Sequence, residues 1–224
     1  MYSDSIAGRL ETVRASLKEG VQLVAISKYH PKERIEEAYA AGQRRFGENY
    51  ILEMAEKAAV LPKDIEWHFT GHVQTNKIKF MAPFVHTIQS VDSFHALSEI
   101  NKHALRNERT IHCLLQLHVA QEDTKYGLTP DECLHLLRTE PWRELKGVRI
   151  TGLMAMATNT NNEVQIRKEF HSVRTFFEQV KKEFFADDTE FSILSEGMTD
   201  DYPIAISEGA NMVRIGSAIF GPRH

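Results

Sequence analysis

Cysteine is scarce in this chain, and so are long apolar runs. Two cysteines, Cys113 and Cys133, are too few for a disulfide framework or a cysteine-rich zinc site, and we expect both to pack as small hydrophobic side chains. No apolar run approaches the roughly 18 residues that cross a bilayer, and residues 1–6 lack the basic and apolar regions of a signal peptide. These absences argue against a membrane-spanning or secreted protein and predict a cytoplasmic location with no membrane partner.

The chain also has little excess charge and lacks two well-known site motifs. Its formal net charge is −4 at pH 7, and no cluster of Lys and Arg interleaved with aromatic residues is present, so we expect no nucleic-acid partner. No G-x-G-x-x-G follows the first expected strand, and no G-x-S-x-G nucleophile motif occurs. Because no linker or low-complexity tract divides the chain, we predict a single domain over residues 1–224.

Short apolar runs rich in β-forming residues alternate with longer amphipathic segments along the whole chain. The expected strands are 21–27, 44–48, 66–71, 85–90, 111–119, 148–156, 190–195 and 212–216. The expected helices are 3–18, 32–42, 49–60, 76–82, 93–106, 130–138, 162–185 and 201–208. This alternation predicts an α/β fold, a closed (β/α)8 TIM barrel, with an open doubly wound sheet as the alternative. Since no room remains for a full eighth helix after the last strand, we expect the extra N-terminal helix, 3–18, to cover that gap.

The first expected strand ends on a lysine. Lys28 closes the apolar run that starts at Val21, and Pro31 opens the next expected helix. Barrel enzymes place their chemistry at the carboxyl ends of strands, and a lysine amine there can form a Schiff base with a carbonyl compound. Lys28 is therefore a candidate for covalent binding. A solvated lysine at a strand end is the plainer alternative.

Glycine and hydroxyl residues follow the last two expected strands. Gly197–Thr199 and Gly216–Ser217 combine a permissive backbone with a hydroxyl, and a short helix is expected to start at Ser217. Backbone N–H groups in such loops bind phosphate, and barrels frequently hold phosphate after strands seven and eight. Simple tight turns are the alternative.

Arg214 lies two residues before the second of these loops. The period of two in a strand points it opposite to Val213 and Ile215, and so into the barrel mouth. An arginine there keeps its charge and needs a partner. Either a strand-end glutamate such as Glu48 or a ligand would satisfy it.

Two further polar pairs are not interpreted as sites of chemistry. His68 and His72 have the spacing of a metal-binding pair on a helix, but their segment has the pattern of a strand entering a loop, and no third ligand follows at a fixed spacing, so we expect no metal. Asp200 and Asp201 are adjacent and tend to point apart. Capping of the next helix is their expected role.

A lysine amine and phosphate-binding loops at one barrel mouth indicate an aldehyde or ketone that carries phosphate. Two ligands satisfy this description. Pyridoxal 5′-phosphate (PLP) would be held by Lys28 as a Schiff base, or a phosphosugar would be handled by a lysine-dependent aldolase. The residues considered so far leave both open.

Seven stretches of the chain are highly specific as a set: Ala25–Lys28, Ala41–Tyr50, Trp67–Lys77, Lys125–Gly127, Gly152–Met154, Gly197–Asp201 and Met212–Gly221. Through them the chain resembles the pyridoxal phosphate homeostasis family over essentially its whole length. The resemblance implies a barrel like the N-terminal domain of alanine racemase, with PLP as the cofactor on Lys28, Asn49 near it and Arg214 facing its pyridine nitrogen. It further implies that the phosphate is surrounded by Ser195, Thr199, Gly216 and Ser217.

One residue departs from the family pattern. Glu196 stands where a methionine is usual in the Ser-x-Gly-Met stretch. A carboxylate beside a phosphate-binding loop would repel the phosphate unless its side chain points outward. The hydroxyl residues Thr199 and Ser217 exchange types with the family pattern but keep its chemistry.

The resemblance also bears on catalysis. An arginine at the pyridine nitrogen leaves that nitrogen unprotonated, which suits a racemase or a carrier better than a transaminase. The related racemase takes a second acid/base from an additional β domain of its dimer partner, and this chain ends at His224 without one. We therefore predict a monomeric, non-catalytic protein that buffers PLP and delivers it, with PLP-dependent apo-enzymes as candidate recipients. The alternative is a PLP-dependent amino-acid racemase or lyase that uses His68 or Tyr50 as second base.

Overall fold

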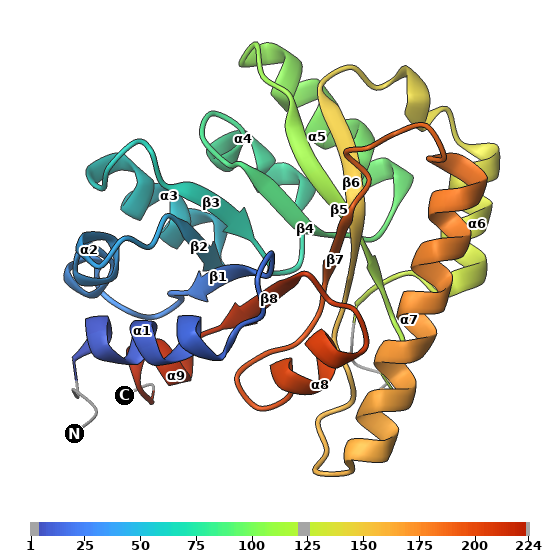
Figure 1. Ribbon diagram of the computed structural model, residues 1–224. Helices are drawn as coiled ribbons and strands as arrows, with labels where there is room; N and C mark the ends of the chain where they lie inside the picture. Colours follow the sequence, from blue (N-terminus) through green and yellow to red (C-terminus); the bar gives the residue numbers. More distant parts are fainter. Residues whose placement is uncertain (1–4, 121–125, 223–224) are drawn as a thin grey trace.

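The eight expected strands form one closed parallel barrel in the computed structural model, which describes residues 5–120 and 126–222 (Figure 1). In ring order they are β1 Gln22–Ile26, β2 Arg45–Glu48, β3 Glu66–Phe69, β4 Thr87–Val91, β5 Ile111–Leu117, β6 Val148–Ala155, β7 Ile193–Ser195 and β8 Met212–Ile215. The last strand closes the ring by pairing with the first, from Gln22 beside Met212 to Ala25 beside Ile215. The TIM-barrel prediction is confirmed, and the open doubly wound sheet is wrong.

Helices surround this barrel (Figure 1). They are α1 Ile6–Ser16, α2 Lys32–Ala40, α3 Ile51–Val60, α4 Ile78–Met81, α5 Phe94–Arg106, α6 Pro130–Thr139, α7 Glu163–Phe184, α8 Tyr202–Ser207 and α9 Ser217–Phe220, with 3₁₀ turns η1 Thr75–Lys77 and η2 Trp142–Glu144. Their starts follow local capping chemistry: Ser93 caps α5, and Thr129 and Glu132 form a reciprocal capping box on α6. Among the helices of residues 5–120 and 126–222, none is long and apolar enough to cross a lipid bilayer.

The N-terminal helix covers the place where an eighth full helix is missing. α1 buries Ile6, Leu10 and Val13, three residues spaced for one helical face, and packs against the short α9. The Arg9 Nε atom donates a hydrogen bond of 2.8 Å to the carbonyl of Ile219. The two ends of the chain thus close the helical layer together, as expected from the sequence.

The seventh strand is shorter than the expected run 190–195 and begins at Ile193. The reason lies in the turn that precedes it. The Glu190 N–H donates to Asp188 Oδ1 at 2.9 Å, and the Glu190 carboxylate forms an ion pair with Arg149. These local polar contacts hold residue 190 in a turn and delay the strand by three residues.

The apolar core lies between the sheet and the helices, whereas the inside of the barrel is partly polar. His68, Gln89, Ser195 and Arg214 come from four different strands, are all buried, and form one hydrogen-bonded chain. A chain that joins opposite sides of a closed barrel must cross its interior. Both cysteines are buried and free, and burial raises the pKa of each thiol, so they pack as expected.

Candidate functional site

Lys28 lies in the turn that leads from β1 into α2. The preceding residue, Ser27, donates its N–H to the carbonyl of Gly47 at 2.9 Å. The following residue, Tyr29, has a left-handed backbone with φ of 65° and donates its N–H to Glu53 Oε1 at 2.7 Å. The backbone is thus held on both sides of Lys28, whose side chain is half-buried. The fold therefore fixes the point from which the Lys28 side chain projects.

A buried cluster of charged side chains stabilises this turn. Lys57 Nζ lies 2.7 Å from Glu48 Oε1, 2.7 Å from Glu53 Oε1 and 2.9 Å from the Ser27 carbonyl. The Ser27 hydroxyl donates to Glu48 Oε1 at 2.6 Å. Burial raises the pKa of Glu48 to about 7, although the adjacent Lys57 ammonium acts in the opposite direction. The cluster therefore fixes Ser27, the residue directly before Lys28.

Asn49 follows the neighbouring strand end. The helix expected from residue 49 begins only at Ile51, because Tyr50 keeps an extended backbone. Thr70 Oγ1 donates to Asn49 Oδ1 at 2.9 Å, which orients the amide. Gly71 is required beside it, since a Cβ at that position would overlap the Asn49 carbonyl.

The loops after β7 and β8 bring two hydroxyls together. Ser217 Oγ lies 3.2 Å from Thr199 Oγ1, and we call these two residues the hydroxyl pair. The first loop turns at Gly197, whose φ of 86° favours glycine. Asp201 stands at the N-cap of α8 but makes no capping bond; its carboxylate accepts the Met198 N–H at 2.6 Å instead. The expected helix-capping role for Asp201 is therefore wrong, because the carboxylate closes the loop that carries Thr199.

Arg214 lies inside the barrel and holds three strands together. Its NH1 atom donates to Ser195 O and Ser195 Oγ, both at 2.8 Å, and NH2 donates to the carbonyl of Ala155 at 2.9 Å. Burial lowers its pKa to about 10, so it stays charged at pH 7. The pairing with Glu48 considered from the sequence does not occur. Because Ser195 Oγ also donates to Gln89 Oε1 at 2.6 Å, Ser195 is grouped with Arg214 and not with the hydroxyl pair.

Strand register brings these groups to one end of the barrel. Ile26 pairs with Gly47 on one side, and its neighbour Ala25 pairs with Ile215 on the other. The residues that follow these strands therefore emerge side by side. A Cβ at Gly216 would lie 3.2 Å from the Ile26 carbonyl oxygen, so glycine allows a close approach there. The resulting set of an amine, an amide, two hydroxyls and a guanidinium suits a ligand with a carbonyl and a phosphate.

Known proteins resemble this chain in sequence and fold. A family model described as "Alanine racemase, N-terminal domain" matches residues 2–224. A pyridoxal phosphate homeostasis protein of Pasteurella multocida is 36% identical over 209 residues, which cover 92% of this chain and 88% of the relative. One from Schizosaccharomyces pombe is 32% identical over 222 residues, covering 96% and 91%.

The chain belongs to the pyridoxal phosphate homeostasis protein family. Among solved structures, PipY of Synechococcus elongatus PCC7942 without PLP is 35% identical and superposes with a TM-score of 0.90, covering 97% of this chain and 100% of PipY. Alanine racemase of Clostridium difficile 630 has a TM-score of 0.77 at 13% identity, covering 97% of this chain and 56% of the racemase. The second likeness shows the fold alone.

Glu196, the residue that departs from this family's pattern, is buried and does not reach solvent. Neither carboxyl oxygen has a hydrogen-bond partner among the described residues. Ser195 faces the barrel interior, so the next residue faces the helices, and its charged neighbours include Arg174 of α7. Burial raises the pKa of Glu196 well above its ordinary value, against the opposing effect of Arg214. The raised pKa favours the uncharged form of the carboxyl group, which weakens the repulsion of a phosphate that the sequence suggested.

Three residues of the site escape sequence reasoning: Lys57, Thr70 and Gln89. Lys57 follows Glu53 by four positions on α3, which is the pattern of an ordinary surface ion pair. Thr70 is a polar residue at a strand end. Gln89 is a polar residue inside an expected apolar strand. Of the three residues, only Gln89 could have been found from the sequence, through its inward-facing position in the alternation of β4.

The two histidines considered as a metal pair lie apart. His68 is buried in the barrel, where its Nδ1 contacts Gln89 Nε2 at 2.9 Å. His72 is exposed at the mouth, 3.8 Å from Asp92 and stacked on Tyr126. They do not form a site together. Lys125, in one of the stretches that carry the resemblance, lies outside the described residues.

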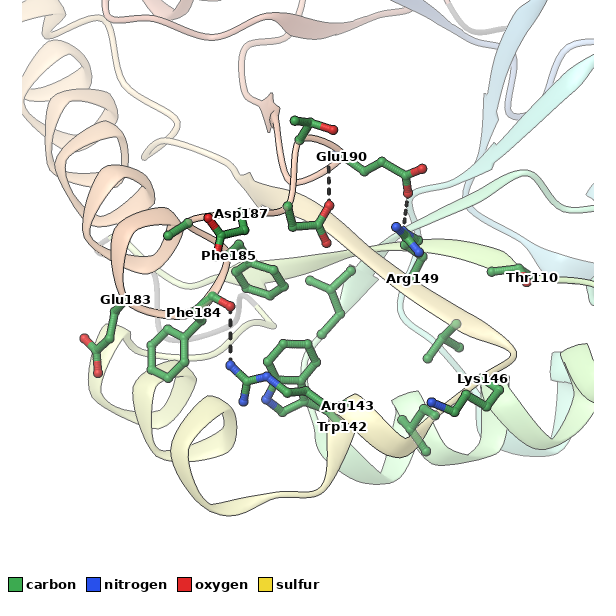
Figure 2. A pocket seen from close by; sticks show the side chains of 16 residues that line it. Thr110, Trp142, Arg143, Lys146, Arg149, Glu183, Phe184, Phe185, Asp187 and Glu190 are labelled. Atoms are coloured by element: carbon green, nitrogen blue, oxygen red, sulfur yellow. Dashed lines mark hydrogen bonds and ion pairs between the residues drawn. The ribbon is translucent and has the colours of Figure 1, made fainter.

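A groove of about 790 Å³ lies at the other end of the barrel, near the starts of β5, β6 and β7 (Figure 2). Trp142 and Phe185 form its apolar part, and the Arg149–Glu190 ion pair forms its charged edge (Figure 2). None of the candidate cofactor residues lines it. The groove is therefore separate from the candidate site.

Proposed function

We propose that this chain binds PLP at the barrel mouth, with Lys28 as covalent tether, and serves as a reservoir that buffers the cofactor and delivers it. The residues at the strand ends carry the proposal, since they provide an amine on a fixed turn beside two hydroxyls. Family membership supports it. PipY "with PLP bound" is 34% identical, has a TM-score of 0.88 and covers 97% of this chain.

Each group has a distinct role in this proposal. Bound PLP supplies an aldehyde that condenses with amines and a ring that accepts electrons. The Lys28 amine would hold the aldehyde carbon, and the hydroxyl pair with the adjoining loop N–H groups would hold the phosphate. Asn49 would lie near the ring. Arg214 is charged at pH 7 and acts only as a donor, so at the pyridine nitrogen it would keep that atom unprotonated.

The surroundings favour a reservoir over a racemase or lyase. A racemase needs a second acid/base on the opposite face of the substrate. His68 is committed to Gln89 inside the barrel, and burial together with His86 lowers its pKa well below the ordinary value. The Tyr50 hydroxyl lies against that of Tyr29 on the exposed rim. Both residues are thus already engaged with other side chains of the chain. In this proposal, residues 1–224 form one monomeric domain in the cytoplasm, and PLP-dependent apo-enzymes receive the cofactor from it.

Exchange of the α-proton of amino acids separates the two functions. The PLP-loaded protein, incubated with a panel of amino acids in deuterium oxide, is expected to incorporate deuterium no faster than free PLP does. Mass spectrometry of the amino acids measures this rate. Exchange of any one amino acid at an enzyme-like rate would replace the reservoir by a racemase or lyase.

Thr70 offers a graded test of the proposed site. A Thr70→Val variant keeps the shape of the side chain but removes the donor that orients Asn49. Loss of one such hydrogen bond, about 1 kcal/mol, is expected to weaken PLP binding about fivefold while leaving the thermal midpoint nearly unchanged. Absorbance titration with PLP measures the affinity. Unchanged affinity would remove Asn49 from the cofactor site.

A further inference from the structure

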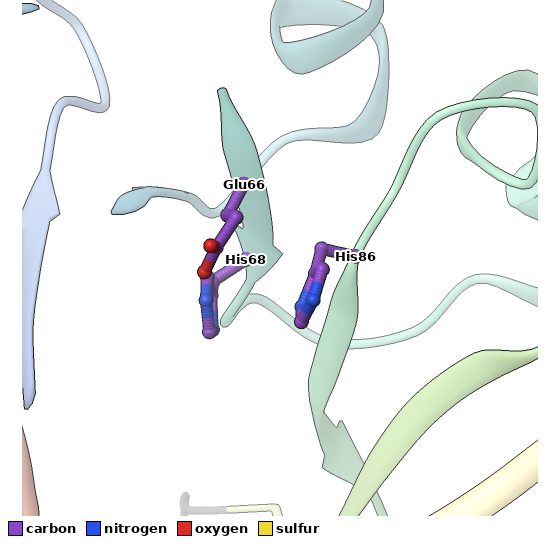
Figure 3. A group of neighbouring side chains, drawn as sticks. All are labelled: Glu66, His68 and His86. Carbon is purple, nitrogen blue, oxygen red and sulfur yellow. The ribbon is translucent and has the colours of Figure 1, made fainter. Parts of the chain in front are cut away.

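Four side chains with metal-binding chemistry gather at the amino-terminal end of the barrel, opposite Lys28. Glu66 and His68 lie on β3, His86 directly precedes β4, and His112 lies on β5. One ligand atom from each of Glu66, His68 and His86 falls within 4.8 Å of the others (Figure 3). The His68 and His86 rings have centroids 5.8 Å apart, and those of His86 and His112 are 5.1 Å apart.

Strand geometry explains why these residues meet. Glu66 and His68 are two positions apart on one strand and so share its inner face. His68 pairs with Thr87, and Thr87 pairs with His112 on the next strand. The residues line a cavity of about 360 Å³ at this end of the barrel.

The second observation is an unpartnered nitrogen. His68 is 1% exposed, and its Nε2 atom has no hydrogen-bond partner among the described residues. A buried polar atom without a partner costs free energy, and the cost is recovered if the atom binds a ligand. The other nitrogen, Nδ1, contacts Gln89 at 2.9 Å, so Nε2 is the His68 nitrogen that is left for a ligand.

We propose that Glu66, His68 and His86 bind a divalent transition-metal ion of the zinc class. Two imidazoles and one carboxylate are a zinc donor set, and a fourth position remains for water or for His112. At zinc–ligand distances of about 2.0–2.1 Å, donor atoms lie about 3.4 Å apart, so the site must contract on binding. Glu66 and His86 are only half-buried and have room to turn.

Neighbouring side chains complete the site. Arg45 Nε lies 2.8 Å from Glu66 Oε2, which leaves Oε1 for the ion. His86 Nδ1 contacts Thr87 Oγ1 at 2.8 Å, which leaves its Nε2. An ion on His68 Nε2 leaves the proton on Nδ1, so the Gln89 amide must then present its oxygen to that ring. Such outer contacts to metal-binding histidines and carboxylates orient the ligands.

Cobalt(II) titration of the full-length protein tests the site, because cobalt reports its coordination number by visible absorption. We expect wild-type protein to develop the intense bands of a four- or five-coordinate ion and to lose them when zinc(II) is added. Competition with a chromophoric chelator then measures the zinc affinity. His86→Ala and Glu66→Gln should each bind at least tenfold more weakly, since each removes one ligand.

The matched control is His95→Ala, which removes an exposed histidine of α5 and should leave the affinity and the bands unchanged. Circular dichroism verifies the fold of each variant, and Glu66→Gln decides the matter if His86→Ala does not fold. The proposal is overturned if wild-type protein gives only the weak bands of six-coordinate cobalt. It is equally overturned if both ligand variants bind zinc as tightly as the His95→Ala control.

Discussion

In a Lys28→Ala variant, borohydride should trap no PLP on the protein, and the visible absorbance of the bound cofactor should disappear. Among side chains, only a lysine amine forms an imine with the aldehyde that borohydride reduces to a stable bond. The turn that carries Lys28 is held by Ser27 and Tyr29 whatever side chain projects from it. The fold should therefore survive. Reduction followed by peptide mapping is expected to find the modified residue at Lys28 in wild-type protein and at no position in the variant.

A Lys77→Ala variant is the matched control. Lys77 lies in η1 at the same end of the barrel and lines a cavity there together with Asn49 and Tyr50. Its removal should leave trapping at Lys28 intact. If the Lys28→Ala variant still traps PLP, the tether is another lysine, and mapping of that variant would identify it.

Replacing Glu196 by methionine should stabilise the protein by about 2 kcal/mol at pH 7. The side chain is 0% exposed, and both of its oxygens lack partners among residues 5–120 and 126–222. Burying an unpaired polar group costs about 1–3 kcal/mol, and a methionine of similar length removes that cost. Urea unfolding, followed by circular dichroism, measures the free energy of unfolding.

The same variant should change how stability depends on pH. The folded-state pKa of Glu196 is raised well above the ordinary value of 4.5. As the pH rises through 4.5, the unfolded chain loses a proton that the folded protein keeps, so Glu196 lowers the stability until the pH reaches the folded-state pKa. Glu48 acts in the same direction up to about pH 7. The Glu196→Met variant should therefore lose the contribution of Glu196 to the pH dependence and keep that of Glu48.

The Glu196→Gln variant separates the effect of ionisation on the pH dependence from the effect of a buried polar group on stability. The amide stays polar and cannot ionise, so this variant should lose the pH dependence due to Glu196 but gain less stability than Glu196→Met. Slopes from other groups, such as His68, cancel because the variants are compared with wild type at each pH between 5 and 8. A methionine variant no more stable than wild type, with an unchanged slope, would contradict both the cost of the unpartnered carboxyl group and its raised pKa.

The barrel itself was predictable because its signals are local. Alternating apolar runs and amphipathic helices can be recognised one segment at a time, and the capping residues Ser93 and Thr129 mark helix starts without any tertiary context. The boundary error at β7 also has a local cause, since the contact between Glu190 and Asp188 competes with the strand. Asp201 shows the limit of this reasoning: it occupies a capping position yet bonds to the loop before it.

The candidate site could be predicted only in part. Lys28, Asn49 and the hydroxyl pair follow strand ends, and a closed parallel barrel collects all such ends on one face. What lies beneath them could not be foreseen. Lys57 joins Glu48 under the Lys28 turn, and Ser195 bonds to Arg214 inside the barrel. These partners lie on different strands and helices, and no spacing in the chain records their meeting.

The sequence by itself determined the order of strands and helices and the strand end at which Lys28 stands, since hydrophobic periodicity is a property of each segment alone. Tertiary structure decided which polar groups meet and which titratable groups have shifted pKa values. The register between strands places His68 beside Thr87, and with it Glu66 and His86 at one end of the barrel. Burial beneath packed helices raises the pKa of Glu196. Both depend on residues distant in sequence, because desolvation and contact are set by neighbours in space.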